Sequence, residues 1–148
     1  MLIVTFVSSF LIQYYIISYI TANKLEDVTN NYGKVYKSLI MGISMVTVEV
    51  MSKDYYYGNL SVRWYIGLLV LNAIVIYMYK NQTAINDVQY LQEMIEQNSV
   101  SMLPTKQIIE KSDNFNVVKL AKVKLYQQED EMRMMREVLD NIVKRGEK

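Results

Sequence analysis

The side chains that most often carry chemistry in proteins are missing from this chain. Its 148 residues include neither histidine nor cysteine, whereas methionine occurs 10 times and tyrosine 13 times. Imidazole and thiolate are the ligands that make a protein site competitive for copper or zinc, and they are common bases and nucleophiles. Acid–base work would fall to carboxylates, lysines or tyrosines, and no activating partner for a nucleophile can be placed. Without a phosphate-binding glycine loop or a basic tract, the sequence predicts no enzymatic activity, no cofactor and no nucleic-acid partner.

The charged residues are concentrated in the part of the chain after Lys80. Residues 1–80 hold six Lys/Arg and four Asp/Glu, whereas residues 81–148 hold ten and eleven. Eleven of the thirteen tyrosines fall in the first part, at the ends of apolar runs. A bilayer interface selects amphipathic rings at these places. The sequence therefore predicts a membrane domain over 1–80 and a polar helical domain over 81–148.

Three apolar runs in the first part are predicted to be transmembrane helices, over residues 2–20, 36–51 and 64–79. The first has nineteen residues and no charge, which at about 1.5 Å per residue approaches the roughly 30 Å hydrocarbon thickness. A secretory signal peptide is the alternative interpretation of this run, but the run lacks the basic start and the small-x-small cleavage site of such a peptide. Burial of the other two runs in a soluble core would leave too little polar surface to cover them.

Small and polar residues within the runs indicate how these helices pack. Ser38 and Gly42 form a small-xxx-small pair, the spacing that lets two helix backbones approach closely in lipid. Glu49 lies near the end of its run, and Asn72 is the lone amide of the third run. A transport path is one interpretation of such groups. The simpler interpretation is that Glu49 reaches the interface and Asn72 hydrogen-bonds a neighbouring helix.

The basic residues around the runs favour one orientation in the membrane. One side of the membrane would carry four of them and the other side two; these are Lys24, Lys34, Lys37 and Lys80 against Lys53 and Arg63. The positive-inside rule then places the C-terminal domain in the cytoplasm.

After residue 80 the apolar spacing becomes that of an amphipathic helix pair. The first stripe, with spacings of four and three, contains Ala84, Val88, Leu91, Ile95, Asn98 and Met102. Pro104 is predicted to end this helix, with a short connecting helix over Thr105–Lys111. Asn114 or Asn116 is the predicted cap of the last helix. Its stripe contains Val118, Ala121, Leu125, Gln128, Met132, Met135, Leu139 and Ile142.

These two stripes predict an antiparallel helical hairpin. Charged residues beside the second stripe are predicted to form a solvated face; they are Glu129, Asp130, Arg133, Arg136 and Glu137. Two helices of this length cannot close a core alone. The stripe must receive the short helix, the membrane helices or a second copy, and a homo-oligomer is predicted.

Part of the polar domain resembles a known family. The resemblance rests on the run Asn-Asp-Val-Gln-Tyr-Leu-Gln-Glu-Met-Ile-Glu-Gln-Asn-Ser over residues 86–99, within a match from residue 81, followed by Leu120-Ala121, Gln128, Glu131-Met132, Met135 and Leu139. In order and spacing these residues are similar to the family named domain of unknown function 305. Its members carry an Asp, then Met-Ile-x-His-His-Ser, then Leu-Ala and Gln-x-x-Glu-Ile-x-x-Met. The resemblance covers residues 82–142 and implies a ferritin-like helical bundle associated with metal handling.

The chain departs from this family where the metal site should be. Gln97 and Asn98 occupy the positions of the paired histidines. The candidate ligands that the resemblance leaves are Asp87, Met94, Met102, Glu131, Met132 and Met135. A thioether cluster can hold Cu(I), but methionines at such spacing are usually core residues. Asn98 and Gln128, the only amides on their stripes, are predicted to hydrogen-bond across the hairpin and fix its register.

Two functions remain open at this stage. The first is a non-enzymatic integral membrane protein with a structural, assembly or interaction role, whose ancestral metal site is lost and whose partners are the lipid membrane, further copies and other membrane proteins. The alternative is a residual copper- or metal-handling membrane protein that uses methionine and carboxylate ligands. Large DNA viruses carry proteins that resemble this family, so a virion membrane is a further predicted location.

Overall fold

The computed structural model describes residues 1–146, and every regular element within that range is a helix. The all-α class predicted from the sequence is therefore confirmed. The chain divides into two compact units. The apolar unit comprises Met1–Ile17 and Tyr32–Ala84, and the polar unit comprises Ser18–Asn31 and the chain from Ile85 onward. The division differs from the one predicted at residue 80, because the segment 18–31 belongs with the polar unit.

Three helices are long and apolar enough to cross a membrane. The first runs over Leu2–Thr21 and consists of α1 (Leu2–Leu11), a π-helical segment (Ile12–Ile17) and α2 (Ser18–Thr21). The others are α3 (Tyr32–Tyr57) and α4 (Val62–Lys80). The predicted runs 2–20 and 64–79 match the first and third closely. The run 36–51 covers only the middle of α3, because hydropathy detects the apolar stretch and not the polar turns that extend it.

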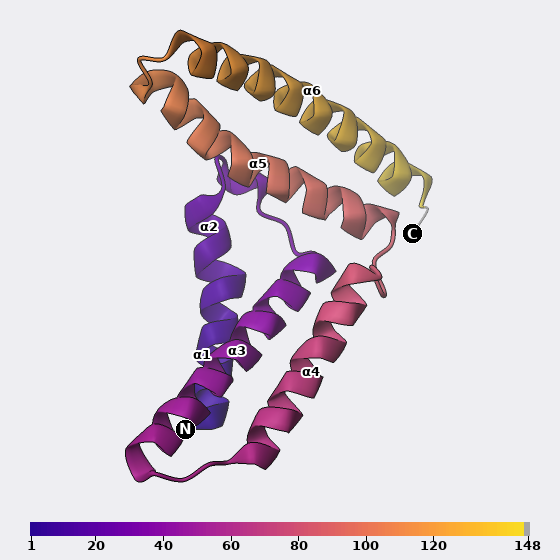
Figure 1. Cartoon of the computed structure of the whole chain (residues 1–148). Coiled ribbons are helices and arrows are strands. Elements are labelled where there is room, and N and C mark those ends of the chain that lie inside the picture. The colour runs from indigo at the N-terminus through magenta and orange to yellow at the C-terminus, as the bar shows by residue number, and fades with distance from the viewer. Residues whose placement is uncertain (147–148) are drawn as a thin grey trace. The chain divides into compact units, whose positions relative to one another are not determined.

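Within the apolar unit, α3 packs against both α1 and α4 (Figure 1). The α1 side of this packing is a ladder of stacked rings, with centroids 6.4 Å apart for Phe6 and Phe10 and 5.8 Å apart for Phe10 and Tyr14. The Lys34 ammonium lies 4.9 Å from the centroid of the Tyr14 ring, a cation–π distance. Aromatic side chains four residues apart lie on one face of a helix, so α1 and the π-helical segment after it present a continuous aromatic ridge.

Polar side chains tie α3 to α4 at three levels. At the turn between the helices, the Ser61 amide donates to Asp54 at 2.6 Å and the Ser61 hydroxyl donates at 2.8 Å. In the middle of the helices, the Asn72 amide donates to Ser44 Oγ at 3.2 Å, which confirms the predicted interhelical bond of this lone amide. At the other end, Tyr36 Oη donates to the Thr83 carbonyl at 2.8 Å.

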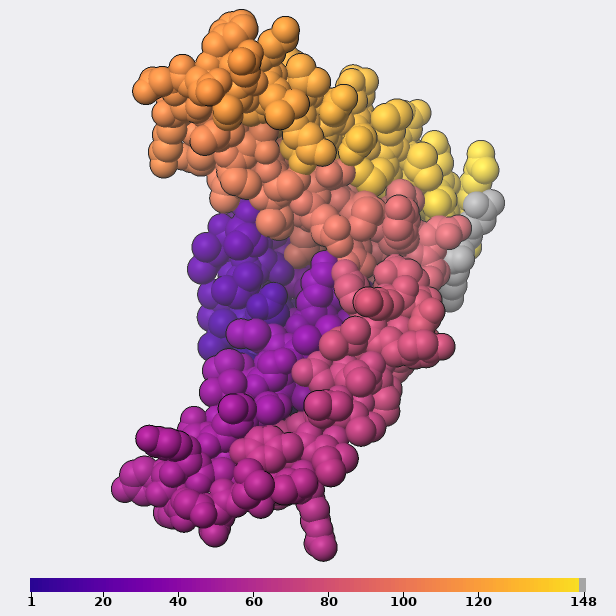
Figure 2. Space-filling model, viewed as in Figure 1, coloured from indigo at the N-terminus to yellow at the C-terminus, as the bar shows by residue number. Residues whose placement is uncertain are grey.

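The polar unit is dominated by α5 (Asp87–Lys111) and α6 (Phe115–Arg145). The Asn86 side chain caps α5 by accepting from Gln89 N, and Asn114 caps α6 by accepting from the backbone of Asn116 and Val117. Asn114 is thus the cap among the two predicted candidates. After a short loop α6 turns back along α5 (Figure 1), and the two helices touch along their length (Figure 2).

Two sequence predictions about α5 are wrong. Pro104 does not end the helix, and Thr105–Lys111 continues it. Proline lacks the N–H that would donate to the Val100 carbonyl four residues earlier, and the hydroxyls of the same turn bond other carbonyls, Ser101 to Asn98 O and Thr105 to Ser101 O. Packing along α6 then offsets a cost of about 3 kcal/mol for proline inside a helix. Ala84 is not on the packing stripe, because it is exposed in the turn before α5 with φ of 61°.

The buried side of α6 is one narrow line. Eight of its residues are buried or half-buried, and every other α6 residue is exposed; the eight are Val118, Ala121, Leu125, Gln128, Met132, Met135, Leu139 and Ile142. These are the positions that the 3-4 spacing placed on the packing side. Ile95 and Met102 of α5 form one buried apolar cluster with Met132 of α6.

Candidate functional site

A densely bonded polar region lies where residues 22–31, here called the connector, meet α5 and α6. The connector links the first candidate span to the second and contains a 3-10 turn over Leu25–Asp27. Extended backbone at Lys24 and Val28 flanks this turn. Its backbone groups therefore lack a helical ladder and must find other partners.

Ser99 on α5 is the first of these partners. Its carbonyl accepts from the Asn23 amide at 3.2 Å, and its hydroxyl oxygen accepts from the Lys24 amide at 3.4 Å. The same hydroxyl donates to Asp27 Oδ2 at 2.7 Å. The Ser99 side chain is fully buried. One small polar residue thus holds three points of the connector.

Asp27 extends the contact from α5 to α6. Its carboxylate is 2% exposed, accepts from Ser99 and forms an ion pair with Arg136 of α6. A carboxylate buried to this degree is costly unless it is both paired and hydrogen-bonded. Here both conditions are met by residues from two different helices, so the connector, α5 and α6 are held at one carboxylate.

Glu96 forms a second, parallel contact one turn earlier on α5. Its Oε2 accepts from the Thr29 amide at 3.1 Å, the Thr29 hydroxyl at 3.3 Å and the Asn31 side-chain amide at 3.1 Å. The Thr29 hydroxyl also lies 3.2 Å from the Gln92 carbonyl. We call the Asp27–Ser99–Arg136 and Glu96–Thr29–Asn31 groups together the connector clamp.

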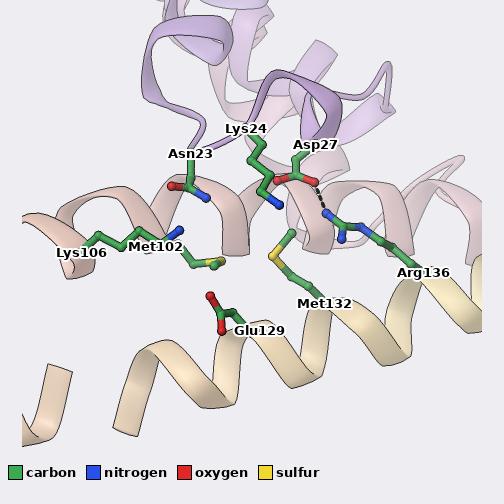
Figure 3. Close-up of a pocket in the computed structure, with 8 residues that line it drawn as sticks. All are labelled: Asn23, Lys24, Asp27, Met102, Lys106, Glu129, Met132 and Arg136. Atoms are coloured by element: carbon green, nitrogen blue, oxygen red, sulfur yellow. Dashed lines mark hydrogen bonds and ion pairs between the residues drawn. The ribbon is translucent and has the colours of Figure 1, made fainter. Parts of the chain in front are cut away.

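A pocket of about 180 Å³ lies beside the clamp (Figure 3). The connector contributes Asn23, Lys24 and Asp27, α5 contributes Met102 and Lys106, and α6 contributes Glu129, Met132 and Arg136. Figure 3 shows the thioethers of Met102 and Met132 turned toward one another at the centre of the view. Three cations and two carboxylates line the pocket, and one of each is already consumed by the Asp27–Arg136 pair. The arrangement favours holding segments together over capturing a strongly charged ligand.

The structure brings together only half of the candidate metal ligands. Met102 and Met132 are 5% and 4% exposed in one apolar cluster with Ile95, and Met135 packs against it. Asp87 and Glu131 are exposed on their helices, and Met94 is half-buried on α5. Over residues 1–146, no group of three or more Asp or Glu side chains is placed to hold a metal ion.

The predicted bond between Asn98 and Gln128 is wrong. Gln128 is 2% exposed, as expected of a stripe position, but its side-chain amide donates to Ser101 Oγ. Ser101 lies almost one turn beyond Asn98 on α5, so the register of the two helices differs from the assumed one. The Gln128 carbonyl oxygen has no hydrogen-bond partner among the described residues.

Ser38 and Gly42 lie on α3, where this helix comes close to α1 in the apolar unit. A Cβ atom on Gly42 would sit 2.9 Å from two ring atoms of Phe6 and 3.3 Å from the Phe6 carbonyl oxygen. Ser38 is fully buried and donates to the Lys34 carbonyl at 2.9 Å. Gly42 therefore admits the aromatic ridge of α1 where any larger side chain would collide with it.

The clamp residues were not foreseen from the sequence. Arg136 was expected on a solvated face, and Asp27 and Glu96 looked like ordinary charges of a loop and a helix. The available signal was a second, polar stripe on α5, since Gln92, Glu96 and Ser99 follow the same 4-3 spacing as the apolar one. That stripe indicates that this face of α5 makes polar contacts, but it does not identify the connector as the partner.

Comparison with known proteins gives one informative relative. The chain is 25% identical over 141 residues to an uncharacterized protein of Acanthamoeba polyphaga mimivirus. The similarity covers 95% of this chain and 91% of that protein, so it includes both units and the connector. No protein-family model and no solved structure matches the chain.

Proposed function

We propose that this chain is a non-enzymatic integral membrane protein with a structural role in assembly at a membrane. The observation that carries the proposal is the exposure of apolar side chains on the candidate spans. Only 6% of the most apolar window of Leu2–Thr21 is buried, and the same share holds for Val62–Lys80. Large apolar surfaces of this kind need a cover. Lipid can provide this cover, because the backbone hydrogen bonds of a helix are satisfied within the helix itself.

The connector clamp supports the structural part of the proposal. A bilayer that contains the first two candidate spans has the connector at its surface, because the connector joins them. The clamp binds that segment through buried polar side chains whose partners lie 65 to 109 residues away along the chain. The clamp therefore joins the connector to α5 and α6 within the polar unit, and it does not offer the reactive groups that a catalytic site requires.

The charge distribution and the viral relative support a proposed location. Lys24, Lys34, Lys37 and Lys80 flank the spans on the connector side, and this excess favours a cytoplasmic polar unit. The relative from a mimivirus fits a viral origin. We therefore place the chain in a membrane of viral particles or of the cell in which they form. In this proposal the polar unit is a ferritin-like remnant of the domain of unknown function 305 family without its metal site.

Fractionation tests this function. Membranes carrying the full-length chain are washed in carbonate at high pH, and we expect the chain to stay in the pellet until detergent is added. In purified viral particles, detergent is expected to release it with the lipid. Release by carbonate alone would refute integration, and absence from particles would refute the viral location.

The methionine cluster supports one alternative, a site for Cu(I). Met102, Met132 and Met135 converge, and thioethers are soft ligands suited to this ion. Tight binding would raise stability by about 2.7 kcal/mol at a hundredfold excess over Kd. We expect no such rise when Cu(I) is added to the purified chain. The double variant Met102→Leu, Met132→Leu is expected to remain folded, since Leu and Met exchange at a cost below about 1.5 kcal/mol. A large copper-dependent rise that this variant abolishes would favour metal handling.

A further inference from the structure

The face of α6 beside its packing line carries a second stripe, which is exposed. We call it the outer stripe; its residues are Val117, Leu120, Lys124, Gln127, Glu131, Met134 and Val138. Each directly precedes a residue of the packing line, so the stripe is rotated by about 100° from it around the helix axis. Four of its seven side chains are apolar and 40% to 71% exposed.

The outer stripe is complementary to its own reverse: reversal keeps the apolar and amide positions and exchanges the two opposite charges. From its first residue the order is apolar, apolar, cation, amide, anion, apolar, apolar, and the central amide is Gln127. Reversal of the stripe places Val117 opposite Val138, Leu120 opposite Met134 and Lys124 opposite Glu131. Neither Lys124 nor Glu131 forms an ion pair among the described residues. Both charges thus lack a partner at positions where a reversed copy of the stripe would supply one.

We propose that the outer stripe binds the outer stripe of a second copy of the chain, with the two α6 helices antiparallel about a two-fold axis at Gln127. Such an interface is isologous, and every contact occurs twice. A parallel arrangement would place Lys124 on Lys124 and Glu131 on Glu131. The charges therefore select the antiparallel pair. This inference rests on the proposed function, and it names the assembling partner as the chain itself.

The size of the outer stripe determines whether two copies pair in solution or only in a membrane. It spans 22 residues, roughly 30 Å of helix, with four apolar side chains per copy. A stable interface in solution buries about 800 Å² per partner, which is more than one such stripe supplies. Anchoring in a shared membrane raises the effective concentration of the two copies. We therefore expect pairing of the full-length chain in membranes and little pairing in dilute detergent.

Single cysteines test the geometry, because the natural chain has none. A disulfide needs Cα atoms within about 7 Å. Under mild oxidation in membranes, Gln127→Cys is expected to form a disulfide dimer. Leu120→Cys alone is expected to form none, because its two copies lie roughly 20 Å apart in the antiparallel pair. When chains carrying Leu120→Cys are mixed with chains carrying Met134→Cys, a disulfide should form between one chain of each kind. Tyr126→Cys is the matched control and should not join, because Tyr126 is 71% exposed but lies about 100° from the outer stripe around the helix axis.

Charge exchange tests the same pair without cysteine chemistry at the charged sites. In the Gln127→Cys background, Lys124→Glu or Glu131→Lys alone is expected to lower dimer yield several-fold. The double exchange should restore it, because reversal again pairs opposite charges. Dimers of Leu120→Cys with itself would show a parallel pair and overturn the proposal, as would equal yields from Gln127→Cys and Tyr126→Cys. Retention after carbonate washing is measured on the same variants, so that loss of pairing and loss of membrane integration are separate results.

Discussion

The two units differ in how many apolar side chains and how many charges their helices expose. In the apolar unit, large apolar residues such as Leu69 and Ile66 are 70% and 60% exposed, while polar groups such as Ser38 are fully buried. In the polar unit, α6 hides one line of mainly apolar residues and exposes nearly all its charges. This contrast is compatible with membrane localisation and is the basis of our proposal that lipid surrounds the candidate spans of the first unit.

The two units also differ in what makes their helices fit. The close approach in the apolar unit depends on a missing side chain at Gly42, against which Phe6 packs. The polar unit depends on buried carboxylates whose partners lie far away in the sequence. Arg136, for example, neutralises Asp27. Shape therefore specifies the first unit, and charge pairing specifies the second. Each can be disrupted separately.

The largest effect is expected at the connector clamp. Arg136→Met leaves the Asp27 carboxylate buried without its cation, and loss of one partner of a buried pair costs about 3–5 kcal/mol. Because the Arg136 side chain is 47% exposed, water can replace part of the pairing, so we expect about 3 kcal/mol. Hydrogen exchange of the α5 and α6 amides in the full-length chain measures this loss.

Arg133→Met is the matched control for that variant. Arg133 pairs with Asp130 at 2.9 Å, but their side chains are 78% and 65% exposed. Exposed pairs contribute at most about 1 kcal/mol. The double variant Asp27→Leu, Arg136→Met should recover much of the loss, since it removes the orphaned charge. Equal effects of Arg133→Met and Arg136→Met would show that Asp27 is not held by Arg136.

The next effect is expected at Gly42. Gly42→Leu places a side chain where a Cβ alone would be 2.9 Å from the Phe6 ring, and overpacking of this kind costs about 1–3 kcal/mol. Gly67→Leu on α4 is the control, because nothing lies within 4 Å of its Cβ position. The midpoint of thermal unfolding in detergent should fall for the first variant and stay unchanged for the second. If both variants behave alike, α1 does not meet α3 at Gly42.

The smallest effect compares one hydrogen bond in each unit. Asn72→Leu removes the bond to Ser44 between two spans, and bonds of this kind average about 0.6 kcal/mol in membrane proteins. Ser99→Ala in the clamp removes the donor of a buried carboxylate and should cost about 1–3 kcal/mol. The comparison uses hydrogen exchange on either side of each bond. A larger loss for Asn72→Leu than for Ser99→Ala would reverse the proposed division between shape and polar pairing.

Local features of this chain could be predicted because they depend on neighbours in sequence. The apolar runs located the three candidate membrane spans, and the 3-4 spacing located the line of α6 residues that are not exposed. Asn114 was recognisable as a cap, since its side chain bonds amides only two and three residues away. The effect of Pro104 was misjudged, because its local cost was weighed without the packing that offsets it.

The candidate site could not be predicted, because its contacts join distant residues. Asp27 and Arg136 are separated by 109 residues, and Asp27 and Ser99 by 72. Nothing in the spacing of a loop carboxylate indicates which helix will neutralise it. The expected Asn98–Gln128 bond failed for the same reason, since a shift of three residues on α5 gave Gln128 another partner in Ser101.

The most direct test of the central claim uses two side chains that are equally exposed in different units. Leu69 on α4 is 70% exposed, and Tyr126 on α6, which lies outside the outer stripe, is 71% exposed. Each is replaced by cysteine in the full-length chain, and open membrane fragments are treated with a water-soluble maleimide. A thiol in hydrocarbon stays protonated and out of reach of this reagent. We expect rapid labelling of Tyr126→Cys and none of Leu69→Cys until the membrane is dissolved and the chain unfolded. Equal labelling of both in intact fragments would contradict a lipid-embedded first unit and, with it, the proposed function.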